Sequence, residues 1–511
     1  MRKTLVAIGI AVFSCASAYA LDTPDELGKA PQAATGENRA QALKKLGDRY
    51  AGVEDYKNAG SFYISALNEA RNSFTIEERK RMATVISWGG AFDEAAGEFE
   101  SILSERPDDL EARLSHARVL SWMGHTVEAL SEAESVLRKA PSDRDALLLK
   151  ADILRWMGEG ERARDIYGKL LEGRDNFGAR AGLVYYNLSE GDVKGANEDL
   201  KLLRPEDAYE EKQLKEITEA VDGASRPSLD ASFNYYNDSD FNQSRSYNLH
   251  YGFLFENLRA NLNYLHTDAE DRIRNNSADN LSAKAETNIA GGVRGGAGAG
   301  VTFLSNLDHS VFPSWFLKVD ARASGADVTA ALSRETITDT AALIGNGVRY
   351  TSLSLAATRN FEKLTMRSWY SYRSYSDDNS AHDFQIAIAY PLYQKDVKLK
   401  AGDKLRFLNY GRQSLGGYYD PDYHISDQVY LNFSWEGGGL YLMAEPYGGY
   451  QTSRRFGNVD SGLFGGCSAS LGYKLSKGLR IEADAEGGNS AIGTVSGFKY
   501  YQAGIKINLV P

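Results

Sequence analysis

The chain has 511 residues, which is a multidomain length, and its formal net charge is -11. A mean hydropathy of -0.42 argues against a bundle of membrane helices, and no run after the N terminus approaches the ~20 apolar residues that a spanning helix needs. The acidic balance disfavours nucleic acid as a partner.

Residues 1–20 have the three parts of a secretory signal. Arg2 and Lys3 supply the positive start, and an apolar centre follows from residue 5 to residue 13. Ala18-Tyr19-Ala20 then forms a small-x-small cleavage site. We therefore expect the chain to be exported from the cytoplasm.

The cysteines bear on how the exported chain is anchored and stabilised. Lipid attachment at Cys15 is an alternative to cleavage after Ala20, but Phe13 is bulky where a lipoprotein signal has a small or β-branched residue. After cleavage only Cys467 remains, so no internal disulfide can form, and we expect Cys467 to be a packed residue on a strand. Residues 21–37 lack periodicity and are predicted to be a leader or linker.

A repeat of 34 residues follows, in which four kinds of residue share one spacing. The recurring positions are Trp88, Trp122 and Trp156; Gly90, Gly124 and Gly158; Ala95, Ala129 and Ala163; and Pro107 with Pro141. This pattern is typical of helix–turn–helix units: tryptophan fills the gap between layers, glycine permits the turn, alanine allows close approach, and proline stops the second helix. Residues 38–224 are thus predicted to form a helical solenoid that resembles the tetratricopeptide family.

The solenoid has two kinds of candidate residue. The three tryptophans are interpreted as repeat core. Arg113, His116 and Arg155 are expected to be exposed and available to a docked partner.

From Ser228 onwards the period changes from that of a helix to two. Apolar Leu479, Ile481 and Ala483, for example, alternate with charged residues, which indicates strands with unlike faces. Roughly sixteen such segments, with tyrosine and tryptophan near many ends, are typical of an outer-membrane barrel, whereas two soluble sandwiches are the alternative. We predict an α + β multidomain chain in which residues 226–511 close into an antiparallel transmembrane β-barrel of about sixteen strands.

Motifs of catalysis and metal binding are lacking in the sequence. It has no HExxH, no P-loop, no GxSxG in a helical context and no Cys/His cluster. The glycine-rich stretch 291–298 is predicted to lie between strands. Glu482 and Asp484 could imitate a glycosidase pair, but their spacing on one strand face favours a solvated wall. We expect no enzyme activity, no cofactor and no metal.

Two short segments carry a resemblance to a known family. Arg334-Glu335-Thr336-Ile337-Thr338-Asp339-Thr340 and Gly416-Gly417-Tyr418-Tyr419-Asp420-Pro421-Asp422-Tyr423 resemble, in this order, segments of the barrels that export bacterial cellulose. A tetratricopeptide solenoid followed by a barrel is similar to the outer-membrane exporters of cellulose and poly-N-acetylglucosamine. The resemblance implies export of an exopolysaccharide through the pore, with the solenoid in the periplasm docking polysaccharide-synthesis proteins of the periplasm or inner membrane, or the polymer itself, and with outer-membrane lipid around the barrel.

Such an exporter needs a hydrated path with many weak contacts. Charged residues predicted on the lumen face would supply it, or would only brace the wall: Arg259, Lys318, Asp320, Arg322, Lys398, Lys400, Arg480, Glu482, Asp484, Glu486 and Lys506. Tyr418, Tyr419 and Tyr423 are candidates for stacking on sugar rings, the alternative being a packed loop that folds inward. Two other functions stay open: a structural or receptor protein whose solenoid scaffolds a periplasmic complex, and a general porin.

Overall fold

The computed structural model of the chain describes residues 36–290, 292–305, 310–323, 325–361, 364–394, 397–414, 416–489 and 499–510. The predicted signal segment, Cys15 and nearly all of the leader lie outside these ranges. The chain divides into two compact units, one of residues 1–189 and 194–221 and one of 190–193 and 222–511.

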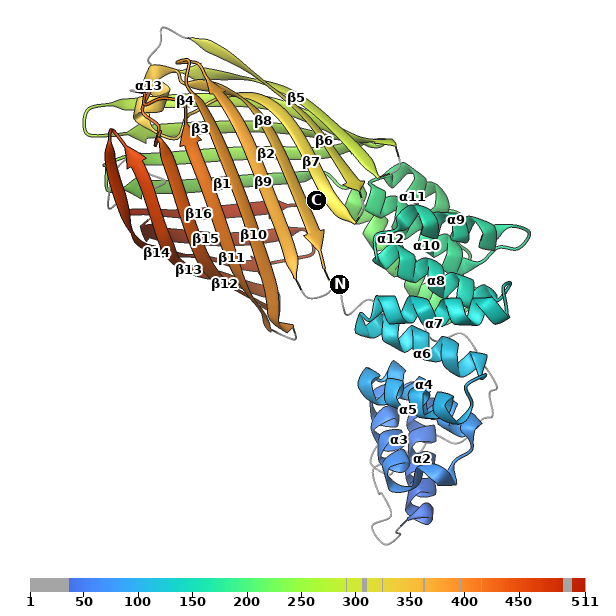
Figure 1. The fold of residues 1–511 in the computed structure, drawn as a ribbon. Coiled ribbons are helices and arrows are strands. Elements are labelled where there is room, and N and C mark those ends of the chain that lie inside the picture. Colours follow the sequence, from blue (N-terminus) through green and yellow to red (C-terminus); the bar gives the residue numbers. More distant parts are fainter. Residues whose placement is uncertain are drawn as a thin grey trace. The chain divides into compact units, whose positions relative to one another are not determined.

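The first unit is built from helices that follow one another as antiparallel neighbours (Figure 1). Its helices are α2 (Glu37–Gly52), α3 (Tyr56–Ala70), the 3-10 turn η2 (Arg71–Ser73), α4 (Ile76–Trp88), α5 (Phe92–Glu105), α6 (Leu110–Met123), α7 (Thr126–Lys139), α8 (Arg144–Trp156), α9 (Gly160–Leu171), α10 (Phe177–Glu190), α11 (Val193–Leu200) and α12 (Ala208–Ser225). None of the helices in the described part of the chain is both long and apolar enough to cross a lipid bilayer.

The 34-residue repeat has a structural cause at each recurring position. Gly90, Gly124 and Gly158 all have a positive φ, between 82° and 86°, which glycine adopts without steric cost. The recurring alanines, such as Ala129, are fully buried where the next helix approaches. Trp88 is half-buried and meets Tyr56 edge to face at 5.2 Å, so its ring belongs to the repeat core as predicted.

The same period governs the helix starts. Thr75, Asp109 and Asp143 each cap a helix with a side-chain oxygen that accepts a backbone N–H three residues later. These caps satisfy N–H groups that the helix itself leaves without partners.

The solenoid residues expected to be exposed are less accessible than predicted. His116 is only 6% exposed, and the side chains of Arg113 and Arg155 are 21% and 17% exposed. The expectation of a freely exposed His116 is therefore wrong, because its ring lies on the inner side of α6.

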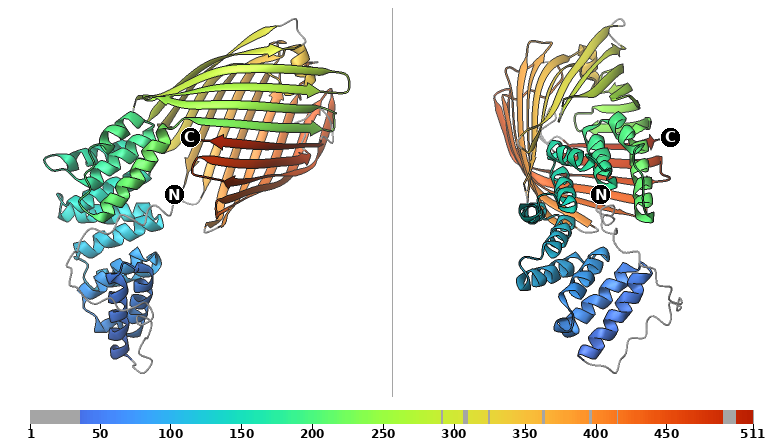
Figure 2. Two further views of the ribbon diagram at one scale, coloured as in Figure 1. Left: turned by 180° about the vertical axis from the view of Figure 1, so that it is seen from behind. Right: turned by 90° about the vertical axis from the view of Figure 1, so that its right-hand side faces the viewer.

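The second unit is a closed barrel of sixteen antiparallel strands, and Figure 2 shows their common tilt. The strands are β1 (Ser228–Asp238), β2 (Gln243–Phe255), β3 (Leu258–Glu270), β4 (Asn275–Ala290), β5 (Val293–Leu304), β6 (Val311–Ala323), β7 (Ala326–Thr336), β8 (Arg349–Asn360), β9 (Thr365–Tyr375), β10 (Ser380–Gln394), β11 (Val397–Tyr410), β12 (Tyr423–Gly437), β13 (Leu440–Arg455), β14 (Asn458–Lys474), β15 (Leu479–Asn489) and β16 (Lys499–Leu509). The short helix α13 (Ala341–Asn346) interrupts this order between β7 and β8.

Closure joins the first strand to the last. Leu229 of β1 pairs with Leu509 of β16, and the register continues to Asp238 and Tyr500. Every strand therefore has two neighbours, which satisfies the backbone polar groups along both of its sides. The predicted barrel and its strand number are confirmed, and the alternative of two soluble sandwiches is wrong.

The outer face of the barrel is apolar. On β2, Tyr247, Leu249 and Tyr251 point outwards and stay between 41% and 47% exposed, and similar side chains recur around the wall. Asp403 and Asp427 interrupt this surface on β11 and β12. A closed barrel with an apolar outside and a polar inside is a membrane-spanning barrel of the outer-membrane type.

Two details of the wall differ from expectation. Cys467 is exposed rather than packed, because it shares the outward face of β14 with Leu463 and Leu471. The glycine-rich stretch lies mostly within β5 rather than between strands. On its inward face a Cβ at Gly298 would lie 2.7 Å from the Ala283 carbonyl oxygen, so the glycines permit a close approach of neighbouring groups.

The two ends of the barrel differ in their connections. At one end, here the turn end, tight turns such as 256–257 and 438–439 join the strands. At the other, here the loop end, segments 337–348 and 411–422 are long. Helix α13 lies at the loop end, and the C terminus lies at the opposite end of the barrel (Figure 1).

Candidate functional site

Two long loops at the loop end fold into the barrel. The β7–β8 loop carries α13, whose N-terminal cap is Thr340 and which ends at Gly347 in the left-handed region. Ala341 and Ile344 of this helix are fully buried against β3, β4 and β5. The Asn276 side-chain amide of β4 donates to the Ala341 carbonyl at 2.6 Å, so the loop is fixed to the wall by both apolar and polar contacts.

The β11–β12 loop packs through Tyr418. Its ring stacks on Tyr375 at 4.5 Å and lies 5.7 Å from the ring of Tyr410. Its hydroxyl donates to the Asp377 carboxylate at 2.8 Å. Burial acts to raise the pKa of Asp377, but hydrogen bonds from Ser414 and Tyr418 outweigh it, so this pKa is lowered.

A buried ion pair joins the same loop to β13. Asp420 has no exposed surface and pairs with Arg455 of β13 at 2.6 Å. Burial raises the pKa of Asp420, while the Ser414 amide and the Arg455 guanidinium act against this rise. We call the Asp420–Arg455 pair the latch.

The two inward loops also contact each other. The Asn346 side-chain amide donates to the Gly416 carbonyl at 3.1 Å. A Cβ at Gly417, where φ is +97°, would lie 2.9 Å from the Ala342 Cβ. The two segments that carry the family resemblance are thus brought into one structure, which narrows the lumen at the loop end.

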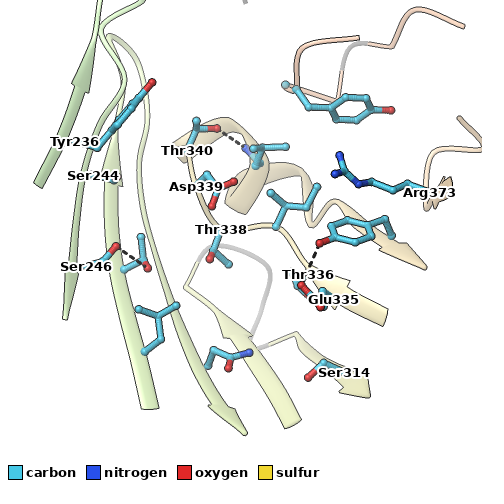
Figure 3. A pocket seen from close by; sticks show the side chains of 18 of the residues that line it. Tyr236, Ser244, Ser246, Ser314, Glu335, Thr336, Thr338, Asp339, Thr340 and Arg373 are labelled. Carbon is cyan, nitrogen blue, oxygen red and sulfur yellow. Dashed lines mark hydrogen bonds between the residues drawn. The ribbon is translucent and has the colours of Figure 1, made fainter. Parts of the chain in front are cut away.

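Beneath these loops lies a cavity of about 1040 Å³ with two chemically different walls. The wall on β1 to β6 also contains Asp238, Lys284 and several aromatic rings, but most of its side chains are small, neutral and polar: Asn234, Ser244, Ser246, Asn263, Thr267, Asn280, Ser282 and Ser314. Tyrosines and arginines form the other: Tyr350, Arg373, Tyr375, Arg406, Tyr410, Tyr418 and Tyr419. Figure 3 shows Ser244, Ser246 and Tyr236 on one side of the cavity and Arg373 on the other, with Thr338 and Asp339 between them.

One buried carboxylate orients both arginines of the second wall. Asp383 of β10 is 1% exposed and accepts two hydrogen bonds from Arg406, at 2.7 and 3.0 Å. Arg373 of β9 approaches the same carboxylate at 3.7 Å. The bidentate contact fixes the plane of the Arg406 guanidinium. Both arginines are thus held at the cavity by the buried carboxylate of Asp383, which is not accessible to solvent.

The predicted lumen residues all lie on the inward side of their strands. Alternation assigns this side, because exposed apolar side chains such as Leu405 and Phe407 take the other positions. Only Glu486 of the eleven lines the cavity, where it accepts from Tyr500 at 2.5 Å and Gln502 at 2.9 Å. Most of the others, from Arg259 to Lys506, belong to the turn-end half of the lumen.

Several of these charges brace the wall. Lys318 pairs with Asp320 at 2.8 Å, and Arg322 pairs with Asp327 at 3.0 Å. The Tyr441 hydroxyl donates to Glu482. Lys506 lies 3.8 Å from Asp230, so pairing extends across neighbouring strands.

The motif residues separate into three groups. Arg334, Asp339, Tyr418 and Tyr419 line the cavity; Asp420 and Pro421 are buried; Asp422 is exposed and Tyr423 begins β12. Tyr418 is 8% exposed and packs against Tyr375 and Tyr410, which favours the packed loop over stacking on sugar. Tyr419 is half-buried, with Arg455 5.7 Å from its ring centre.

Sequence reasoning missed the residues that complete this site. Arg373, Asp383, Arg406 and Arg455 were not singled out, nor was the neutral wall. For Arg406 a signal was present, since it shares its strand face with the predicted Lys398 and Lys400. Nothing local in the sequence marks Asp383 as the partner of two arginines.

No three His, Cys, Asp or Glu side chains gather as a metal ion would require, as far as the described residues go. Most polar groups of the cavity are instead hydroxyls and amides, which suit hydrogen bonding to a hydroxylated ligand.

Comparison with known proteins finds similarities to separate parts of the chain. Residues 89–153 match the family described as tetratricopeptide repeat. No curated protein matches the chain. The helical unit finds a counterpart in TTC0263, a thermophilic tetratricopeptide protein of Thermus thermophilus, with 18% identity and a TM-score of 0.30 over 35% of this chain and 98% of that chain.

Two solved barrels are also similar to part of the chain. A structure described as a bacterial polysaccharide outer membrane secretin has a TM-score of 0.47 and 12% identity, over 56% of this chain and 99% of that chain. OccK2 (OpdF) of Pseudomonas aeruginosa, in complex with glucuronate, has a TM-score of 0.34 and 13% identity, over 56% of this chain and 97% of that chain. The repeats, the closed barrel and its apolar outer face together make this chain an outer-membrane β-barrel with a tetratricopeptide domain.

Proposed function

We propose that the barrel exports an exopolysaccharide across the outer membrane. The observation that carries the proposal is the cavity beneath the inward loops, where a wall of amides and hydroxyls faces a wall of tyrosines and arginines. Sugar hydroxyls both donate and accept, and such side chains offer each of them a partner without a strong ionic trap.

The inward loops favour a gated pathway over an open general porin. The β7–β8 loop is fixed to β4, the two loops contact each other, and Asp420 fixes the β11–β12 loop to Arg455 of β13. Passage of a polymer requires the loops to move. Loop and lid motions of this kind occur on microsecond to millisecond timescales.

In this proposal the chain transports and does not catalyse. The helical unit lies in the periplasm and docks proteins of polysaccharide synthesis or the emerging chain, as solenoids do with their extended surfaces. The alternative is a scaffold whose barrel stays shut, and it differs in one measurable respect, because it predicts normal polymer secretion when the lumen is blocked.

The test narrows the cavity and leaves the outer wall intact. Asn263 and Ser282 face each other on the inward sides of β3 and β4, and the double variant Asn263→Leu with Ser282→Leu should reduce polymer secretion at least fivefold. Leu262→Ile with Ala283→Val alters the paired outward positions of the same strands and should secrete normally. Unchanged secretion in a strain that lacks the protein would exclude the exporter function altogether.

A further inference from the structure

Cations occur on the inward side of several strands of the barrel, and they are most numerous on β9 and β11. Six of them lie on β9 and β11, and we call this set the basic strip: Arg367, Arg373, Lys398, Lys400, Lys404 and Arg406. On β11 the even-numbered Arg406, Leu408 and Tyr410 border the cavity, while odd-numbered Leu405 and Phe407 are exposed outwards. Alternation therefore places the three lysines inside.

Strand pairing makes the strip continuous. β10 lies between β9 and β11, and the register sets Arg367, Ala387 and Lys404 side by side. One level nearer the loop end, Trp369, Gln385 and Arg406 follow. The inward side chains of β10 are thus short or neutral at these levels, so nothing on the intervening strand screens the cations from the lumen. Asp383, the acidic inward residue of β10, lies where the strip meets the cavity.

The pairing of these cations differs from that of the cations on β6. Arg373 and Arg406 share Asp383. For Arg367, Lys398, Lys400 and Lys404, the described part of the chain offers no carboxylate within 4.0 Å. Lys318 and Arg322 on β6, by contrast, are both paired.

Unpaired cations side by side do not stabilise a wall. Lys398 and Lys400, like Lys404 and Arg406, are consecutive inward residues of β11, so their charges repel each other, and bracing needs opposite charges, as on β6. The chain as a whole is acidic, with a net charge of -11, so a run of cations along one inner wall is not a consequence of composition. A ligand with negative charges would relieve this repulsion.

We infer that the transported polymer is acidic and carries carboxylates along its length, an inference that rests on the proposed export function. Consecutive inward residues of a strand are about 6.6 Å apart, so the strip offers a series of cations that a repeating polyanion can follow. The arginine forks match carboxylate geometry, and the lysines act as adaptable point charges. The neutral wall across the lumen then contacts the hydroxyls of the same sugar units.

The test measures binding, so it does not require the loops to open. The full chain in detergent micelles is titrated by calorimetry with a galacturonate hexamer and with the neutral cellohexaose. The double variant Lys400→Gln with Lys404→Gln should lower the affinity for the galacturonate hexamer at least tenfold, which corresponds to about 1.4 kcal/mol of binding free energy. The matched variant Lys318→Gln with Arg322→Gln removes two paired cations from β6 and should change the affinity for the galacturonate hexamer less than threefold. Raising the salt concentration should weaken binding of the acidic hexamer only.

Equal binding of the two hexamers, or galacturonate binding that survives loss of Lys400 and Lys404, would overturn the inference and indicate an uncharged polymer. Neither result bears on export itself, because that is decided by secretion from a strain without the protein. Normal secretion from such a strain removes the export function whatever the hexamers do.

Discussion

Removing the carboxylate of the latch should open the pore. Asp420→Asn preserves the size of the side chain but removes the negative charge that pairs with Arg455. Breaking a buried ion pair from one side costs about 3–5 kcal/mol, since the remaining charge stays desolvated. Arg455 keeps 19% of its side chain exposed, so we take the lower limit of about 3 kcal/mol, which changes the ratio of closed to open loop by roughly a hundredfold.

The same loop supplies the control. Asp422 pairs with Arg454 at 3.5 Å, with 42% and 51% of the two side chains exposed, and an exposed pair of this kind contributes at most about 1 kcal/mol. In planar bilayers, Asp420→Asn should therefore raise the fraction of time spent open far more than Asp422→Asn. If the two variants insert equally and conduct alike, the buried pair does not hold the loop closed.

Two further substitutions test the wall and the solenoid. A Cβ at Gly472 of β14 would overlap the Tyr441 ring, whereas one at Gly462 of the same strand meets nothing within 4 Å. Gly472→Ala should therefore destabilise the barrel by about 1–3 kcal/mol and lower the temperature of its gel-mobility shift. Equal shifts for Gly472→Ala and Gly462→Ala would contradict the packing argument. Burial lowers the pKa of His116, with Glu132 and Glu100 acting against it, so the folded solenoid favours the neutral ring. The stabilisation from this preference is complete above the ordinary histidine pKa of about 6.5 and is lost as the pH drops below it. His116→Met should remove this loss of stability between pH 7.5 and 5. Because both ring nitrogens lack hydrogen-bond partners, it should also raise the free energy of unfolding by about 1–2 kcal/mol at neutral pH. Thermal melting followed by circular dichroism at 222 nm measures both effects, and an unchanged dependence of stability on pH would contradict the prediction.

Most of the fold could be predicted from the spacing at which residue types repeat in the sequence. A step of 34 residues located the helical pairs, and a step of two located sixteen strands, because both patterns follow from how side chains repeat along a helix or a strand. The same periods held information that the prediction did not use. His116 stands 34 residues after Met82, which is 1% exposed, and this equivalence predicts its burial. Cys467 stands four residues from both Leu463 and Leu471, which places it on their outward face.

The site was less accessible to such reasoning. The cavity depends on where two loops settle, and their contacts join residues far apart in the chain, such as Asn346 with Gly416 and Asn276 with Ala341. Turn and loop residues have no period, so the motifs of the loops could be recognised but their direction could not. Tyr418 illustrates the consequence, since its ring looks available in the sequence and is covered by Tyr375 and Tyr410 in the fold.

The order of side chains along the barrel axis links the two proposals. Lys398 and Lys400 lie near the turn end of β11, and Arg406 reaches the cavity near the loop end, where Asp383 neutralises part of its charge. Beyond that level most polar side chains of the walls are hydroxyls and amides. An acidic polymer that enters at the turn end would thus meet its strongest ionic contacts first and weaker hydrogen bonds later. Because ionic contacts at the exit would hold the polymer inside the pore, this order favours release at the loop end once the latch opens.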